Sequence, residues 1–135
     1  MIRYLIDTDI ASYFLRQTHP PLNARMKAAM REGEIALSAI TRAELRYGQS
    51  LMETQDRRQN LINLFLMEAP TLKWTSAAAD HYGQLAAIQK KPGKPIGVMD
   101  TQIAAHALAE ELTLVTHNTR HYKRIPGLKI EDWTR

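Results

Sequence analysis

The sequence of 135 residues contains no cysteine. Without thiols the chain has no disulfide framework, no cysteine nucleophile and no thiolate zinc site. Long apolar runs are also missing: the densest, residues 61–67, is interrupted by Asn63, whereas a membrane-spanning helix needs about 18 apolar residues. These absences predict a protein that acts in the cytoplasm and not in a membrane.

Charge of one sign is only mildly in excess. The chain has 18 Lys and Arg against 14 Asp and Glu, a net charge of +4. This excess is compatible with a nucleic-acid partner but does not require one, because net charge bears on association and not on fold. With 44% hydrophobic residues the chain has enough apolar side chains for a core, and its length predicts a single domain, residues 1–135.

Short β-like runs alternate with longer helical patterns along the chain. We expect strands near residues 2–6, 35–39, 72–74, 114–115 and 128–130, and helices from about Ile10, from Pro20 to Gly33, over 41–52, from about Leu61 to Pro70, and over 76–89 and 99–111. Strands separated by helices predict an α/β fold with a central, largely parallel sheet.

Three acidic residues stand where such a fold places its functional groups, beyond the carboxyl ends of the strands. Asp7 follows the first strand, and Glu44 and Asp100 stand near the starts of two helices. Each has a purely structural explanation. Asp7 can cap the next helix, Glu44 can pair with Thr41 in a capping box, and an acid such as Asp100 is favoured by the helix dipole.

Taken together, the three acids indicate more than helix capping. Three carboxylates brought close would repel one another unless a cation lay among them, and their hard oxygens favour Mg²⁺ or Mn²⁺ over zinc. Glu44 also heads a stripe of Tyr47, Gly48, Leu51 and Met52 that we expect to be one helical face. The chain has no Ser-His-Asp motif and no glycine-rich phosphate loop. This combination suits metal-assisted hydrolysis of a phosphodiester.

Motifs in order along almost the whole chain carry a resemblance to a known family. They are Leu5-Ile6-Asp7-Thr8-Asp9-Ile10, Ser38-Ala39-Ile40-Thr41-Arg42-Ala43-Glu44-Leu45, Pro95-Ile96-Gly97-Val98-Met99-Asp100 with Ile103-Ala104-Ala105-His106-Ala107, Leu114-Val115-Thr116-His117-Asn118-Thr119-Arg120-His121-Tyr122, Arg124-Ile125-Pro126-Gly127-Leu128 and Glu131-Asp132-Trp133. The chain resembles the PIN-domain ribonucleases, and within them the VapC-type toxins of bacterial toxin–antitoxin pairs. The resemblance implies a PIN-like three-layer α/β/α sandwich.

The resemblance also implies a catalytic, metal-binding site. Its acids fall on Asp7, Glu44 and Asp100, and a fourth position, an acid in many PIN nucleases, falls on Asn118. An amide oxygen can ligate Mg²⁺ but brings no charge, and Asp9 is an alternative source of a fourth acid. At the strand ends, Thr8, Ser38 and Thr116 are expected to hydrogen-bond the ligating acids.

The activity that the resemblance implies is that of an endoribonuclease dependent on Mg²⁺ or Mn²⁺. Metal-activated water would attack the phosphodiester of an RNA, often a structured one such as tRNA, and leave 3′-hydroxyl and 5′-phosphate ends. A cognate VapB-type antitoxin would inhibit the enzyme, and the toxin would be a homodimer.

Basic residues lie close in sequence to each proposed acid. They are Arg42 and Arg46 beside Glu44, Lys90, Lys91 and Lys94 before Asp100, and Arg120, Lys123 and Arg124 after Asn118. Such groups can neutralise an RNA backbone beside a metal, whereas any one Lys taken alone is explained better as a solvated surface charge.

Two other functions stay open on the sequence alone. Asp7-Thr8-Asp9 after a first strand also occurs in phosphohydrolases of the haloacid-dehalogenase type, although Ala11 stands where those enzymes have Thr. The chain is also short for that fold. The remaining alternative is a non-catalytic module that binds RNA or a partner and whose acids only cap helices.

Overall fold

The computed structural model describes residues 1–90 and 96–135, so that Lys91 and Lys94 lie outside the described residues. The elements are β1 (Tyr4–Ile6), α1 (Thr8–Arg16), α2 (Pro20–Arg31), β2 (Ile35–Ser38), α3 (Ala39–Ser50), α4 (Arg58–Glu68), β3 (Thr71–Leu72), α5 (Ser76–Lys90), α6 (Val98–Ala109), β4 (Thr113–Val115), α7 (Thr119–Tyr122) and β5 (Ile130–Glu131). All five strands join one sheet in the order β3-β2-β1-β4-β5.

Every neighbouring pair of strands in this sheet is parallel. Ile6 on the central strand β1 pairs with Leu37 of β2 on one side and with Val115 of β4 on the other. The strand order changes direction between β1 and β4, because the chain reaches β2 and β3 on one side of β1 before it returns to β4 on the other. The prediction of a parallel α/β sheet is confirmed.

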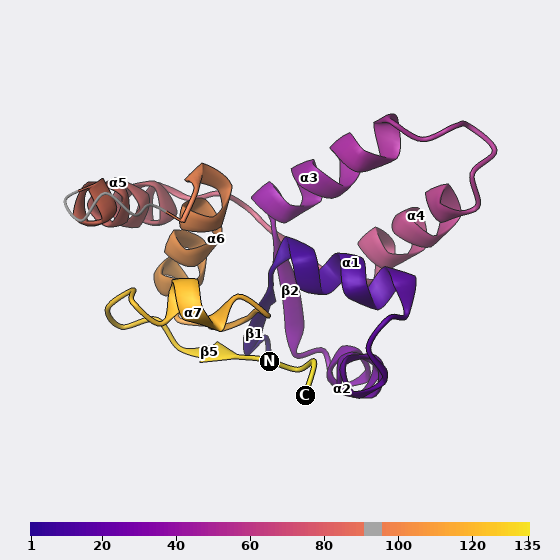
Figure 1. Cartoon of the computed structure of the whole chain (residues 1–135), viewed down its shortest axis with the longest axis horizontal. Helices are drawn as coiled ribbons and strands as arrows, with labels where there is room; N and C mark the ends of the chain where they lie inside the picture. Colours follow the sequence, from indigo (N-terminus) through magenta and orange to yellow (C-terminus); the bar gives the residue numbers. More distant parts are fainter. Residues whose placement is uncertain (91–95) are drawn as a thin grey trace.

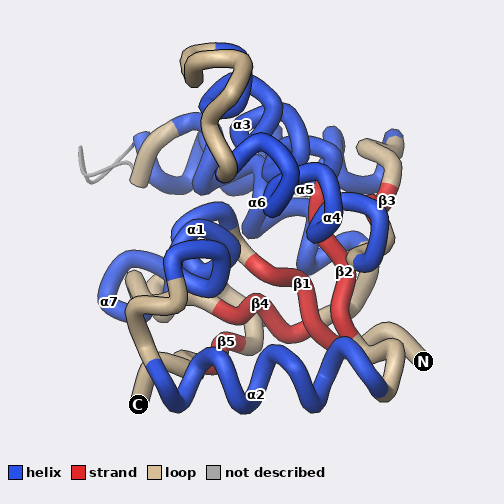
Figure 2. Tube along the Cα trace, turned by 90° about the vertical axis from the view of Figure 1, so that its right-hand side faces the viewer, coloured by secondary structure: helices blue, strands red, loops and turns tan. Residues whose placement is uncertain are grey.

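Helices cover both faces of the sheet (Figure 1). Successive side chains of a strand point to opposite faces, so Tyr4 and Ile6 pack in one core cluster with residues of α1, α2 and α4. Leu5 packs in the other cluster with residues of α5 and α6. Figure 2 views the molecule from the side of α1, α2 and α4, with the strands behind these helices. The expected three-layer sandwich is therefore the observed architecture.

Helix α3 differs from its prediction in two respects. It begins at Ala39, and its cap is Ser38, whose hydroxyl accepts the Ile40 N–H at 3.1 Å. Thr41 is therefore inside the first turn and is not the cap of a capping box with Glu44. The residues of the expected helical face are also not all covered by the rest of the protein, because Tyr47 is 68% exposed and Leu51 71% exposed. Tyr47 lies in the C-terminal half of α3 and Leu51 directly follows this helix, which extends with α4 away from the sheet (Figure 1).

Other differences are small. The third strand ends at Leu72, the last strand is Ile130–Glu131, and the short helix α7 was not predicted. No helix within residues 1–90 and 96–135 has the length and apolarity needed to cross a bilayer.

Candidate active site

Asp7 lies at the carboxyl end of β1, beside the end of β4. Its backbone N–H donates to the Val115 carbonyl at 3.1 Å, and its side-chain Oδ1 accepts the Ile10 N–H at 2.8 Å as the N-cap of α1. The sequence analysis offered capping and site chemistry as alternatives, and the capping contact is present. It uses one carboxylate oxygen, and it places Asp7 where the strand order reverses, the position of ligand crevices in open parallel sheets.

Asp7 is costly to keep ionised at this position. The residue is only 3% exposed, and burial raises the pKa of its carboxyl from 3.8 to about 7. The negative charges of Asp9 and Asp100 raise this pKa further, whereas the Thr116 hydroxyl and the Ile10 N–H lower it. Asp7 therefore lies within electrostatic range of two further acids.

Glu44 belongs to the same group of charges. Its Oε1 accepts a hydrogen bond from the Thr8 hydroxyl at 2.6 Å, which joins α3 to the start of α1. Burial raises the pKa of Glu44, Asp100 and Asp9 raise it further, and the Thr8 hydrogen bond opposes the shift. The carboxylate is thus held partly out of water and close to like charges.

Asp100, in the first turn of α6, completes the group. Burial raises its pKa and so does Asp9, whereas the Tyr122 phenol and His121 lower it. The Tyr122 hydroxyl is buried and has no hydrogen bond of standard geometry within the described residues. It therefore faces Asp100 with an unused donor.

We call the group formed by Asp7, Asp9, Glu44 and Asp100, together with the Thr8 that bonds Glu44, the acidic crevice. Asn118 lies at its rim, where its Nδ2 donates to Asp9 Oδ2 at a long 3.4 Å. The structure thus brings the four acids and Asn118 together from α1, α3, α6 and the loop after β4. Four mutually repelling carboxylates, one of them buried, are what a bound cation would stabilise.

The donor chemistry of the acidic crevice fits a hard divalent cation. Its ligand atoms are carboxylate and amide oxygens, with no sulfur in the chain, and such atoms suit Mg²⁺ or Mn²⁺. As the side chains stand, no three His, Asp or Glu residues within 1–90 and 96–135 have the geometry to hold an ion. Glu44 in particular is engaged by Thr8, so that side chains would have to turn toward the ion.

The three hydroxyl residues expected to support the acids behave differently. Thr8 bonds Glu44 directly. Thr116 is buried beside Asp7, lowers its pKa, and accepts the Asn118 N–H at 3.0 Å. The expectation for Ser38 needs correction, because its hydroxyl caps α3 and lies 2.7 Å from His106 Nδ1 instead of contacting an acid.

The basic residues divide into those tied to the protein and those free to meet an anion. Arg42 donates to Thr71 Oγ1 at 3.0 Å, and Arg46 donates to Gln49 and Asn63 at 2.8 and 2.7 Å. By contrast, Arg120, Lys123 and Arg124 are exposed in and after α7. Lys90 ends α5.

Two residues of α7 were missed as members of the site. His121 and Tyr122 both change the pKa of Asp100, yet the sequence analysis assigned no role to either residue. Their only signal in the sequence was their place three and four residues after Asn118, and a four-residue helix has no periodicity to place them on a face.

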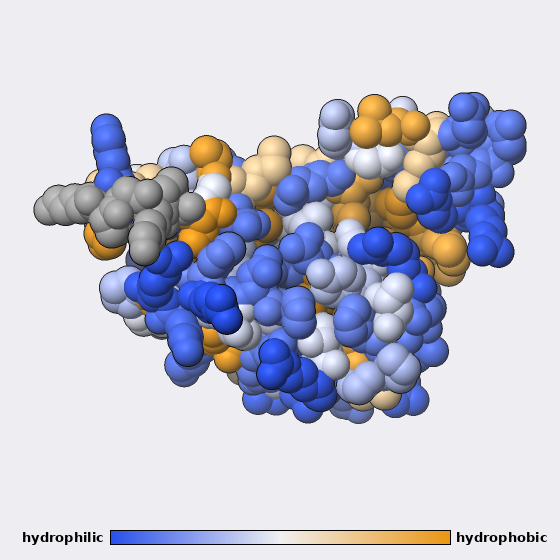
Figure 3. All heavy atoms as spheres, viewed as in Figure 1, coloured by the Kyte–Doolittle hydropathy of each residue, from blue (hydrophilic) through white to orange (hydrophobic). Residues whose placement is uncertain are grey.

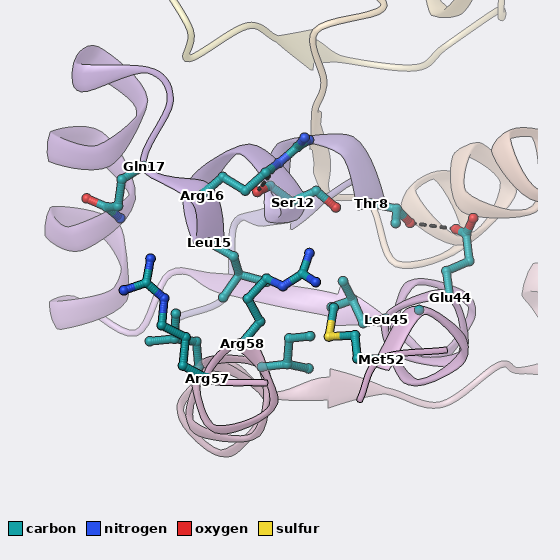
Figure 4. Close-up of a pocket in the computed structure, with 13 residues that line it drawn as sticks. Thr8, Ser12, Leu15, Arg16, Gln17, Glu44, Leu45, Met52, Arg57 and Arg58 are labelled. Carbon is teal, nitrogen blue, oxygen red and sulfur yellow. Dashed lines mark hydrogen bonds between the residues drawn. The ribbon is translucent and has the colours of Figure 1, made fainter. Parts of the chain in front are cut away.

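A second cavity adjoins the acidic crevice. It has a volume of about 770 Å³ and lies between α1, α3 and α4; we call it the helical groove. Figure 3 shows apolar side chains gathered between α3 and α4, and Figure 4 shows the lining side chains. They are Thr8, Ser12, Leu15, Arg16, Gln17, Glu44, Leu45, Gly48, Met52, Arg57, Arg58, Leu61 and Ile62. Thr8 and Glu44 therefore belong to both the crevice and the groove.

Comparison with known proteins agrees with this geometry. Residues 4–128 match the PIN domain family. The tRNA(fMet)-specific endonuclease VapC of Shigella flexneri is 33% identical over 99% of this chain and 100% of that protein. The ribonuclease VapC2 of Haemophilus influenzae is 36% identical over 98% and 99% of the two chains.

Solved structures show the same likeness. The structure of VapBC2 from Rickettsia felis, bound to a DNA fragment from its promoter, superposes with a TM-score of 0.88 at 33% identity, over 98% of this chain and 99% of that chain. DNA-bound VapBC from Salmonella typhimurium gives 0.89 at 31% identity, with the same coverage.

Proposed function

Because the chain belongs to the PIN-domain family, and within it to the VapC ribonucleases of toxin–antitoxin systems, we propose that it is an endoribonuclease dependent on Mg²⁺ or Mn²⁺. We propose a structured RNA such as tRNA as its substrate and a VapB-type antitoxin as its inhibitor. We infer that it acts in the cytoplasm, as a homodimer with one PIN domain over residues 1–135. The observation that carries the proposal is the buried Asp7 within range of Asp9 and Asp100.

Asp7 and Asp100 are the ligands that we assign to the ion, with Glu44 as a third and Asn118 or Asp9 as a further contributor. Asp7 is fixed by its capping contact to α1 and leaves a second oxygen for an ion. Glu44 needs to exchange its hydrogen bond from Thr8 for a ligand bond. When bound, the ion would activate water and stabilise the charge that develops on the phosphate.

The remaining residues bind and orient the RNA. Arg120, Lys123 and Arg124 are exposed and close in sequence to His121 and Tyr122, which lower the pKa of Asp100, and they can neutralise backbone phosphates beside the acidic crevice. Lys90 precedes Asp100 in the sequence and is a further candidate, whereas Lys91 and Lys94 lie outside the described residues. Arg42 and Arg46 are assigned a smaller part, because both donate hydrogen bonds within the protein. The relative in Shigella flexneri is named for tRNA(fMet), which supports a tRNA substrate.

The helical groove is the site that we propose for the antitoxin. Its apolar side chains, which include Leu45, Met52 and Ile62, suit the apolar side chains of a peptide, and the guanidinium group of Arg57 suits its carboxylates. The guanidinium group of Arg58 is instead paired with Asp56 at 2.6 Å. Since Thr8 and Glu44 also line the groove, a peptide bound there would lie against the acidic crevice and obstruct RNA. The VapBC structures from Rickettsia felis and Salmonella typhimurium support a VapB partner.

Cleavage of RNA by the purified protein tests the proposal. Total tRNA is incubated with Mg²⁺, with Mn²⁺, or with excess chelator, and the 5′ ends of the fragments are sequenced. We expect cleavage at one or a few positions with metal, none with chelator, and 5′-phosphate ends. Cleavage that persists undiminished in chelator would refute the metal dependence. Cleavage of unstructured RNA at the same rate as tRNA would refute the substrate class.

A further inference from the structure

His106 is a buried polar residue that the proposed function leaves without a part. It lies on α6, is fully buried, and packs edge-on against Trp74 with ring centroids 5.6 Å apart. Its Nε2 has no hydrogen bond of standard geometry within the described residues. An apolar ring would make the same packing contact without leaving a buried nitrogen unpaired, so packing alone does not account for a histidine here.

The other ring nitrogen of His106 makes a short hydrogen bond to a neighbouring helix. Nδ1 lies 2.7 Å from Ser38 Oγ, and this bond is buried. Ser38 Oγ already accepts the Ile40 N–H, so its own proton is free to be donated to Nδ1 of a neutral imidazole. Burial lowers the pKa of His106 and so favours the neutral form. Glu110 and the backbone of Lys73, which follows β3, raise this pKa. On this hydrogen-bond network we assign the proton of the ring to Nε2.

The hydrogen bond joins the two helices that carry Glu44 and Asp100. Ser38 caps α3 and precedes Glu44 by six residues, and His106 follows Asp100 by six residues on α6. At about 1.5 Å per residue, each acid stands about 9 Å along its helix from the bond. The helices α3 and α6 also contact each other, and Glu44 is within electrostatic range of Asp100.

We propose that His106 is a positioning residue of the acidic crevice: its hydrogen bond to Ser38 fixes α3 against α6 and thereby sets Glu44 relative to Asp100. This role rests on the proposed function, because the hydrogen bond would control the relative positions of the residues that we propose as metal ligands. Groups that hold ligands in place commonly change metal affinity or activity by 10- to 100-fold when they are removed.

Three variants test the role by their affinity for Mn²⁺ alone, measured by calorimetry, and by RNA cleavage. His106→Phe keeps the ring and loses the hydrogen bond, and we expect Mn²⁺ affinity and kcat to fall about 10-fold while KM for RNA stays within about 2-fold. His106→Asn places an amide oxygen near the position of Nδ1, and we expect it to recover most of the loss. Leu85→Ala removes a buried side chain from the core cluster against which Trp74 also packs, and we expect it to lower stability but not Mn²⁺ affinity.

Ser38→Ala removes the other partner of the hydrogen bond, and alone it should lower Mn²⁺ affinity as His106→Phe does. If the two residues act through one bond, adding His106→Phe to Ser38→Ala produces little further loss of Mn²⁺ affinity. Full Mn²⁺ affinity in His106→Phe, an equal loss in Leu85→Ala, or additive effects in the double variant would each overturn the positioning role. A wild-type protein that binds Mn²⁺ but cleaves no RNA would refute the proposed function alone, since the Mn²⁺ titrations would still decide the part of His106.

Discussion

The acidic crevice and the helical groove share Thr8 and Glu44 but are built on opposite principles. The crevice collects four carboxylates, and burial raises the pKa of Asp7, Glu44 and Asp100. The groove is a cavity of about 770 Å³ whose surface is mostly apolar, although three arginines also line it. In the proposed function a cation would stabilise the carboxylates of the crevice, and a partner would cover the apolar surface of the groove. In the proposed function the crevice cleaves RNA and the groove binds the inhibitor, and Thr8 and Glu44 belong to both.

The largest expected effect comes from removing a charge in the crevice. In Asp7→Asn and in Asp100→Asn we expect cleavage of RNA to fall by about 10³-fold, which corresponds to several kcal/mol of lost stabilisation of the transition state. Single-turnover rates with saturating Mg²⁺ measure the loss. Asp80→Asn, a change of an exposed acid on α5, is the matched control and should cleave normally. A loss below about 10-fold in both site variants would mean that these carboxylates are only helix caps.

Asp7→Asn should make the metal-free protein more stable, although it lowers activity. The folded-state pKa of Asp7 is about 7 against an ordinary 3.8, so the folded protein binds this proton more tightly than the unfolded chain does. Stability is therefore lost as pH rises from about 4 to about 7, with an upper bound of about 4 kcal/mol. Asp7→Asn avoids this loss and can retain the capping contact through its amide oxygen.

Urea denaturation in chelator at pH 5 and pH 8 measures this effect. We expect Asp7→Asn to exceed the wild type by about 2 kcal/mol at pH 8 and by much less at pH 5, because only the ionised carboxyl is destabilising. Added Mn²⁺ should stabilise the wild type at pH 8 and not the variant. Equal stabilities at both pH values would show that the crevice tolerates the charge of Asp7 without a cation.

The sequence predicted the crevice much better than the groove. The position of Asp7 could be predicted because it directly follows a short apolar strand. In a parallel sheet, the topology places such a residue at the carboxyl edge. The groove depends instead on how far α3 and α4 stand apart. The spacing of Tyr47 and Leu51 predicted one helical face, and these residues are exposed, since periodicity indicates a helical face and not what covers it.

The supporting contacts of the crevice show the same limit. Ser38 was expected to face an acid, but as the cap of α3 it bonds Ile40 and His106. A partner 68 residues away in the sequence leaves no local pattern. His121 and Tyr122 were missed for a related reason, since their contact with Asp100 arises only when α7 packs beside α6.

A charge introduced into the groove should leave RNA cleavage unchanged and weaken the binding of the antitoxin. Leu61 on α4 lines the groove and is 46% exposed, whereas Leu64 on the same helix is 53% exposed and does not line it. We expect Leu61→Asp to weaken binding of a VapB-type antitoxin by about 10- to 100-fold, because it buries a charge against an apolar surface. Leu64→Asp should bind normally, and both variants should cleave RNA at the wild-type rate. Equal weakening by both would move the antitoxin site away from the groove.

The smallest expected effect is on RNA binding, and it should distinguish Arg124, which follows α7, from Arg46 on α3. Arg124 is exposed after α7 and makes no hydrogen bond or ion pair with the described part of the chain, whereas Arg46 is held by Gln49 and Asn63. We expect Arg124→Ala to raise KM for RNA about 3-fold and to make the salt dependence of binding shallower by about one counterion. Arg46→Ala should change stability without changing that salt dependence, because its guanidinium already has partners within the protein. Binding measured from low to moderate salt distinguishes the two, and an equal change in salt dependence for both variants would show that RNA contacts α3 as well as α7.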